Sequence, residues 1–170
     1  FEEIYFKITS ENKFIYALFI FLIAITRLPY LIFVDSGLPS SDVAHYVNFA
    51  ENLAKGNGFQ KNFIEHWFIS DGTGDQLSFE ERHYSNAYPG YSLFLSFFIY
   101  LGISITNLKF VQSLLFMFFI FVYYSYVKKF FGKSTAFLTS IIVIFSPIFF
   151  LLSITLMTDL LNVLIFIIIM

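Results

Sequence analysis

The carboxylate with the most informative setting in this sequence is that of Asp42. Two serines precede it and can cap a helix that continues to Gly56. At about 100° per residue, Asp42 falls between Phe49 and Leu53, just inside the apolar side of that helix. An Asp in a first helical turn stabilises the helix by only about 0.3–1 kcal/mol, and it would do so equally well on the polar side. The position therefore favours a partner or a substrate for Asp42.

A second carboxylate stands at the start of the last apolar run. Asp159 follows Thr158 and can serve as a helix cap and dipole residue, or it can act on a substrate. If Asp42 and Asp159 lie at the same membrane surface, one could act as a base while the other orients the acceptor. The sequence requires no cofactor, and a divalent metal, if one is used, would be held by Asp42 and Asp159.

One basic residue, Arg27, lies inside the first apolar run, three residues before Tyr30. Its guanidinium could extend to the outer membrane interface. It could also bind a lipid phosphate, or pair with Asp35 or Asp42. The sequence leaves these alternatives open.

The histidines are weaker candidates for a functional site. His45, His66 and His83 have no recognisable zinc-ligand spacing, and most are expected to be solvated. Arg82 or His83 could contact an anionic head group. The sequence contains no phosphate-binding glycine loop and no nucleophile elbow, so nucleotide-binding and hydrolase functions have no support.

The composition indicates which elements must position these groups. Hydrophobic residues make up 58% of the 170 residues and charged residues only 13%, with a mean hydropathy of +0.74. A soluble domain has roughly 25% charged residues, so this chain could not cover a water-facing surface. The net charge of −2 comes with no basic stripe and gives no sign of nucleic-acid binding, and the absence of cysteine excludes disulfides. The sequence therefore predicts an integral membrane protein.

Four apolar runs are expected to be membrane spans, since a span needs about 20 apolar residues. They cover residues 14–34, 108–127, 134–154 and, cut short by the end of the sequence, 160–170. The chain is accordingly interpreted as an N-terminal fragment of a longer protein. A further apolar run, residues 91–103, is too short for a span and fits an interfacial or re-entrant helix better.

A lysine cluster orients these spans. Lys128, Lys129 and Lys133 follow the second long run, and the positive-inside rule places them in the cytoplasm. Residues 35–107 would then form an external loop that carries two juxtamembrane helices, about 41–56 and 89–103. If residues 91–103 crossed the membrane, the lysines would lie outside instead. The predicted fold class is an all-α, multi-span helical bundle.

The first juxtamembrane helix is predicted to be amphipathic and to lie along the membrane surface. Its apolar arc contains Val43, Tyr46, Val47, Phe49, Ala50, Leu53 and Ala54. Its polar side contains His45, Asn48, Glu51, Asn52 and Lys55.

These loop residues resemble the first external loop of GT-C glycosyltransferases, which include protein mannosyltransferases and the aminoarabinose transferases of lipid A. The family pattern is roughly D-E-x-x-Y-x-x-x-A-x-x-L-x-x-G, after a first span that often ends with an arginine. The matching residues here are Arg27, Asp42, Tyr46, Ala50, Leu53 and Gly56. Four later segments are also similar to the family, namely Tyr88-Pro89-Gly90-Tyr91, Phe130-Phe131-Gly132-Lys133, Ser146-Pro147 as the end of the third span, and Thr158-Asp159.

The resemblance covers about residues 14–166, with two departures. Val43 replaces the second acid of the D-E pair, which argues against metal binding at that point. The residues before Pro89 lack the acid and lysine of aminoarabinose transferases, which argues against that substrate.

The resemblance implies an inverting transfer of a sugar from a polyprenyl-phosphate donor. The acceptor would be a lipid, glycan or protein on the outer face of a bacterial plasma membrane. Asp42 would be the general base, Asp159 would assist in positioning or metal binding, and the substrate contacts would include Arg27, Tyr46, Arg82 and His83. The alternatives are a structural membrane subunit and a transporter or flippase fragment, whose pathway would be lined by Arg27, Asp42 and Asp159.

Overall fold

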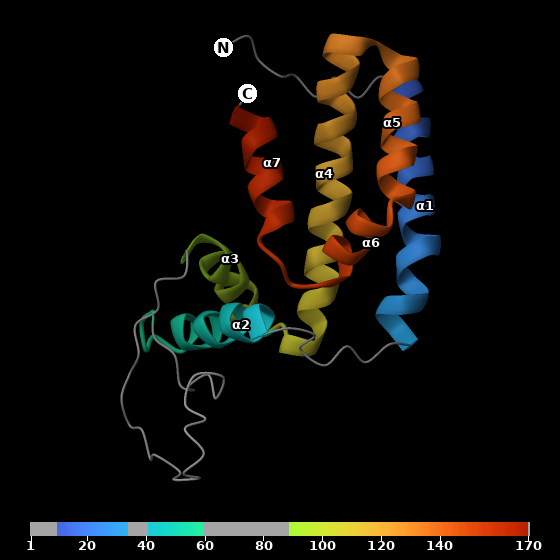
Figure 1. Ribbon diagram of the computed structural model, residues 1–170. Helices are drawn as coiled ribbons and strands as arrows, with labels where there is room; N and C mark the ends of the chain where they lie inside the picture. Colours follow the sequence, from blue (N-terminus) through green and yellow to red (C-terminus); the bar gives the residue numbers. More distant parts are fainter. Residues whose placement is uncertain (1–9, 34–40, 60–88, 170) are drawn as a thin grey trace, which may run out of the picture. The chain divides into compact units, whose positions relative to one another are not determined.

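The computed structural model describes residues 10–33, 41–59 and 89–169 (Figure 1). Within these ranges the chain is helical and contains no strand, so the all-α class predicted from the sequence is confirmed. In chain order the elements are α1 (Ser10–Phe33), α2 (Ser41–Ala54), α3 (Pro89–Tyr100), the short 3₁₀ helix η2 (Ile105–Asn107), α4 (Leu108–Phe131), α5 (Lys133–Phe145), α6 (Pro147–Ile154) and α7 (Asp159–Ile169).

The chain divides into two compact units, which are described separately. Unit 1 consists of Phe1–Gly37 and Lys109–Met170, and it contains α1 together with α4 to α7. Unit 2 consists of Leu38–Leu108 and contains α2, α3 and η2.

In unit 1, α1 and α4 run antiparallel. Near the start of α1, the hydroxyl of Tyr16 lies 3.2 Å from Oγ of Ser125, which is near the end of α4. Further along α1, the guanidinium of Arg27 lies over the ring of Phe116, in the first half of α4. The segment between the two helices therefore begins and ends at the same end of unit 1.

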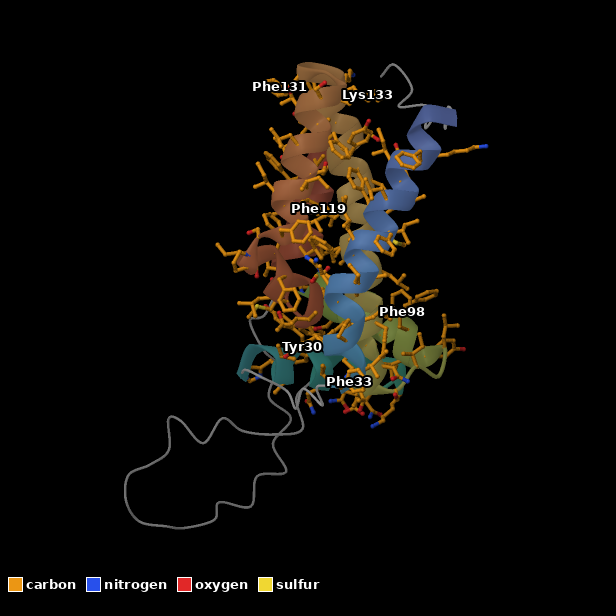
Figure 2. All side chains as sticks on the ribbon, turned by 90° about the vertical axis from the view of Figure 1, so that its right-hand side faces the viewer. Tyr30, Phe33, Phe98, Phe119, Phe131 and Lys133 are labelled. Carbon is orange, nitrogen blue, oxygen red and sulfur yellow. The ribbon has the colours of Figure 1, made fainter. Side chains whose placement is uncertain are left out.

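Figure 2 shows the two ends of this unit. Phe131 and Lys133, at the turn between α4 and α5, lie at one end, and Tyr30 and Phe33 lie at the other. The lysine cluster is thus on the side where α1 begins, opposite the end at which α1 stops.

The helices of unit 1 are apolar on all sides. On α1, Phe19 and Ile23 are buried, whereas Phe21, Ile25 and Ile32 are exposed. A helix that is hydrophobic all round belongs in a large core or in a membrane. Two helices of the described residues are long and apolar enough to cross a bilayer, over Lys13–Phe33 and Ile105–Phe131.

The predicted third span differs from the structure. The sequence indicates one span over residues 134–154, but this stretch forms two helices, α5 and α6, that are bent by 66°. Pro147 has no N–H to donate to the carbonyl of Val143, and its ring forces Ser146 out of the helical region. Ser146 is extended (φ −65°, ψ 128°), and its own N–H reaches Val143 O at 3.3 Å.

The second long helix is longer than predicted. Residues 108–127 were expected to be helical and the lysines to lie in a turn, but α4 continues through Lys128 and Lys129 to Phe131. Lysines in a last helical turn complement the negative end of the helix dipole. Gly132, with φ +83°, ends α4 by donating to Lys128 O at 3.2 Å, and α5 begins at the next residue.

In unit 2, α2 packs against α3, and both helices end in the same way. After α2, Gly56 (φ +77°) donates to Leu53 O at 3.1 Å, and Asn57 donates to Asn52 O at 2.9 Å. This pair of bonds is a Schellman motif, in which glycine adopts the left-handed conformation at little cost. After α3, Gly102 (φ +88°) forms the same two bonds.

The faces of α2 are only partly as predicted. Val43, Val47 and Phe49 of the apolar arc are buried. However, His45 and Asn52, which were assigned to the polar side, are also buried, with exposed fractions of 8% and 0%. The predicted polar side is therefore wrong for these two residues, because α2 is covered over more of its circumference than its apolar arc.

The Schellman glycine of α3 gives a first testable prediction. Ala at position 102 would have to adopt φ +88°, which costs an L-residue about 1–2 kcal/mol. Gly102→Ala in the full-length protein should therefore lower the midpoint of thermal unfolding in detergent. Gly90→Ala is the matched control, since Gly90 is helical and has open space at its Cβ position. It should leave the midpoint unchanged or raise it, and equal losses from both variants would contradict the prediction.

Candidate functional site

The candidate site is built around Arg27, which α1 places inside unit 1. Arg27 is six residues before Phe33, the last residue of α1, so it lies about 9 Å from that end of the helix. Its side chain does not extend to the interface, since it is only 1% exposed. The guanidinium is instead directed into the interior of the unit.

Three hydrogen bonds hold the guanidinium. Nη2 donates to the carbonyl oxygen of Ile144 at 2.7 Å, Nε donates to Oγ of Ser153 at 3.2 Å, and Nη1 donates to the hydroxyl of Thr26. Oγ of Ser153 in turn donates to the carbonyl of Phe150 at 2.7 Å, so this hydroxyl uses both its proton and a lone pair. Arg27 thereby links α1 to α5 and α6.

Two aromatic rings cover the same guanidinium. Its Cζ lies 4.7 Å from the ring centroid of Phe116 on α4 and 5.3 Å from that of Phe150 on α6. The negative face of an aromatic ring attracts a cation, most strongly where water is excluded. These rings partly replace the water that Arg27 has lost.

The hydrogen bond from Arg27 to Ile144 satisfies a backbone carbonyl at the end of α5. Ile144 lies in the last turn of α5, where the break at Ser146 and Pro147 interrupts the regular helical hydrogen bonds. The last carbonyls of a helix have no intrahelical donor and carry the negative end of its dipole. A buried guanidinium satisfies both the hydrogen bond and the charge at this position.

Gln112 supplies a hydrogen-bond donor to the carbonyls at the end of α6. Its Nε2 donates to the carbonyl of Leu152 at 2.8 Å and lies 3.3 Å from the carbonyl of Met157. Gln112 comes from α4 and is fully buried. The two halves of the broken helix α5–α6 are thus completed by side chains from two other helices.

The charge of Arg27 remains uncompensated within the part of the chain that the structure describes. No described carboxylate forms an ion pair with it, and only three of its five N–H groups donate in the bonds above. An isolated charge in an apolar interior is costly unless it is paired. The arrangement can therefore accept an anionic group, and a planar guanidinium suits a phosphate or carboxylate.

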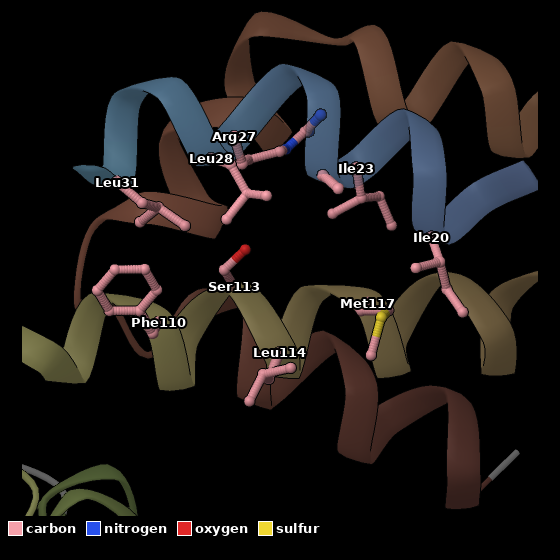
Figure 3. A pocket seen from close by; sticks show the side chains of 10 residues that line it. Ile20, Ile23, Arg27, Leu28, Leu31, Phe110, Ser113, Leu114 and Met117 are labelled. Carbon is pink, nitrogen blue, oxygen red and sulfur yellow. The ribbon is translucent and has the colours of Figure 1, made fainter. Parts of the chain in front are cut away.

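A groove runs beside Arg27 between α1 and α4. It has a volume of about 240 Å³, and its wall is almost entirely apolar. Figure 3 shows the apolar side chains of α1 and α4 along it, with the hydroxyl of Ser113 directed toward α1. The lining residues are Ile20, Ile23, Ala24, Arg27, Leu28, Leu31, Phe110, Ser113, Leu114 and Met117. Such a groove suits an alkyl or isoprenoid chain.

Asp159 is the first residue of α7, as the sequence predicts, and its side chain is exposed. The N–H of Asn162 donates to Thr158 O at 3.0 Å, which is the first helical bond of α7. Met157, two residues earlier, lies against Gln112 in the first turns of α4. Asp159 is therefore at the Arg27 end of unit 1, but the structure does not bring it into contact with Arg27.

The other predicted residues belong to unit 2 or lie outside the described residues. The ring of Tyr46 packs edge-on against that of Tyr91 at 5.4 Å between centroids. Burial raises the pKa of Tyr91, and the nearby Tyr46 raises it further, so Tyr91 stays protonated at neutral pH. Arg82 and His83 are outside the described residues, as is the side chain of Asp42.

A shared metal site of Asp42 and Asp159 stays a prediction, because the two residues belong to different units. Among the described side chains, no group of three His, Cys, Asp or Glu residues could hold a metal ion. Sequence reasoning missed Gln112 and Ser153. The available signal was that each is a polar residue within an otherwise apolar helix, where such residues usually serve as hydrogen-bonding groups.

Comparison with protein-family models, with curated proteins and with solved structures found no match for this chain. The resemblance to GT-C glycosyltransferases therefore rests on the sequence motifs alone.

The role of Gln112 gives a second testable prediction. Gln112→Leu keeps a similar volume but removes the donor to the carbonyls at the end of α6, and a buried unsatisfied group costs about 1–3 kcal/mol. The full-length variant should unfold at a lower temperature in detergent. Ser113→Ala changes the next residue, whose hydroxyl lines the groove, and should leave the unfolding temperature unchanged. A Gln112→Leu protein as stable as the wild type would show that the α6 carbonyls are satisfied in another way.

Proposed function

We propose that this chain belongs to an integral, multi-pass membrane glycosyltransferase of the GT-C type. The enzyme would move a sugar from a polyprenyl-phosphate donor to a lipid, glycan or protein acceptor at the outer face of a bacterial plasma membrane. The motifs of the loop after the first apolar helix support this assignment, as do the two helices that are long enough to cross a bilayer.

The single observation that carries the proposal is the guanidinium of Arg27, which is buried and has no carboxylate partner among the described residues. A lipid-phosphate donor keeps its tail in the bilayer, so its phosphate must meet a cation at the depth of the lipid–water boundary. Arg27 lies about 9 Å inside the end of α1 and beside an apolar groove. A cation in a water-excluded setting stabilises the charge that develops on a departing phosphate.

The reaction assigns a role to each acid. The acceptor hydroxyl attacks the anomeric carbon from the face opposite the phosphate, and its proton passes to the carboxylate of Asp42. The bond between the anomeric carbon and the phosphate oxygen breaks, and polyprenyl phosphate leaves with the electron pair. Asp159 positions the acceptor or holds a divalent metal, and Tyr46, Arg82 and His83 contact the substrates.

One observation favours a second candidate, a transporter or flippase. Transporters often bind substrates at broken helices, and α5 and α6 form a broken pair with polar side chains at both of its ends. Transporter sites, however, lie near the bilayer midplane. The 24 residues of α1 extend about 36 Å, so Arg27 lies about as far from the middle of the helix as from its end, and this depth does not distinguish the two candidates. The acids Asp42 and Asp159, which the sequence predicts at one membrane surface, favour an enzyme that works at the boundary.

A transfer assay separates the two functions. The full-length protein, purified in detergent, should transfer label from a polyprenyl-phosphate sugar to an acceptor, and a nucleotide sugar should not replace that donor. Arg27→Met should abolish transfer, while Thr139→Ala, whose hydroxyl bonds to Thr135 O within α5 and does not line the groove, should not. Direct use of a nucleotide sugar would overturn the proposal. Uptake or flipping of the labelled lipid in proteoliposomes without any transfer would favour the second candidate.

The role of Asp42 gives a further prediction. Asn at this position keeps the shape and the capping preference of Asp but cannot take a proton, and loss of a general base costs about 10²–10⁴-fold in rate. Asp42→Asn should therefore insert and bind donor normally and transfer sugar at a rate lower by that factor. Asp71→Asn, in the same loop, is the control and should remain active. Wild-type turnover by Asp42→Asn would remove the base assignment.

A further inference from the structure

The two sides of α3 differ in exposure. Tyr91, Ser92 and Leu95 are buried. Four large side chains on the other side are exposed, with exposed fractions of 53% for Leu93, 58% for Phe97, 77% for Tyr100 and 60% for Leu101. Their spacing of i, i+4, i+7 and i+8 puts them on one side of the helix. We call these four residues the α3 stripe.

Apart from the hydroxyl of Tyr100, the α3 stripe contains no group that needs water. No residue of α3 is charged. The hydroxyl of Ser96, at the edge of the stripe, donates to the carbonyl of Leu93 at 2.8 Å within the helix. A serine bonded in this way presents little polarity to its surroundings.

The partner helix α2 has no comparable surface. None of its large apolar side chains is among the exposed ones in the described residues, because Val43, Val47 and Phe49 are buried. Lys55, which directly follows α2 and is exposed, forms an ion pair at 3.7 Å with the half-buried Glu51 of α2. The apolar arc of α2 is therefore buried inside unit 2. Among the described residues of the helix pair, the exposed apolar surface lies on α3.

The covalent chain determines which apolar phase the α3 stripe can reach. Tyr100 is five residues before Ile105, where the candidate span Ile105–Phe131 begins. Five extended residues cover at most about 17 Å, so α3 stays close to the bilayer surface at which this span starts. The twelve residues of α3 extend only about 18 Å, too short to cross roughly 30 Å of hydrocarbon.

The sequence predicts both juxtamembrane helices at the membrane surface, α2 through its apolar arc. Because that arc is buried, we propose instead that α3 alone lies in the bilayer surface, with the α3 stripe facing the acyl chains of the phospholipids and α2 on the side away from them. Tyr100 suits the edge of this contact, since a tyrosine ring is apolar while its hydroxyl can stay at the head groups. Unit 2 is thus anchored to the membrane by a monotopic helix in addition to the spans. The proposal goes beyond glycosyl transfer and does not depend on it.

A quenching experiment tests this placement in the full-length protein. Trp67, the one tryptophan of the sequence, is replaced by Phe, and a single tryptophan is introduced by Phe97→Trp or, as a control, by Lys55→Trp. Each variant is reconstituted into phosphatidylcholine vesicles with and without bromine atoms on the acyl chains. The Phe97→Trp emission should be blue-shifted and should fall by more than about half with brominated lipid, because position 97 lies against the acyl chains. The emission of the Lys55→Trp variant should be the same with and without brominated lipid.

Three results would overturn the proposal. A water-like, unquenched emission from Phe97→Trp would mean that the α3 stripe faces solvent. A blue-shifted emission that brominated lipid does not quench would mean that protein, either unit 1 or a second copy of the chain, covers it. Equal quenching of both variants would mean that α2 also enters the acyl region, which contradicts the assigned orientation.

Discussion

A helix that breaks inside an apolar bundle leaves backbone carbonyls without donors, and in hydrocarbon no water can replace them. The bend between α5 and α6 creates this need at the end of α5, and the end of α6 at Ile154 creates it a second time. Arg27 supplies a donor to Ile144, and Gln112 supplies one to Leu152. Because these donors come from α1 and α4, the broken helix ties together three parts of unit 1 that are far apart in the sequence.

This constraint also bears on the proposed chemistry. Arg27 is bound into the fold by Ile144, Ser153 and two aromatic rings, so a substrate phosphate would meet a guanidinium whose direction is already fixed. Preorganised charge acts on a developing anion without the cost of reorienting dipoles. In the proposed reaction the same side chain would serve both the backbone and a ligand, because two of its five N–H groups make no hydrogen bond within the described part of the chain.

The all-α class and the positions of α2 and α3 could be predicted from the sequence, because the signals are local. The glycines that end both helices and the shortage of charged residues are visible without any tertiary information. The family resemblance marked Ser146-Pro147 as the end of a span, but the predicted span ran on to residue 154 because hydropathy along residues 134–154 is continuous and only the missing N–H of Pro147 marks the break. Helical periodicity also misassigned His45 and Asn52, because it cannot tell how much of the circumference of α2 its neighbours cover. The direction of Arg27 depends on α5 and α6, and no pattern within α1 specifies it.

The one-residue connection at Gly132 has a consequence for the order of assembly. The loop-closure entropy for bringing α5 alongside α4 is minimal, whereas joining α1 to α4 requires closing the whole of residues 34–107. That cost grows with the logarithm of loop length, by about 0.6 kcal/mol for each doubling. The hairpin of α4 and α5 is accordingly the cheaper nucleus, and Gln112, which belongs to it, can cap α6 early. Arg27 can join only when α1 arrives, so the carbonyl of Ile144 is the last of the broken helix to gain its partner.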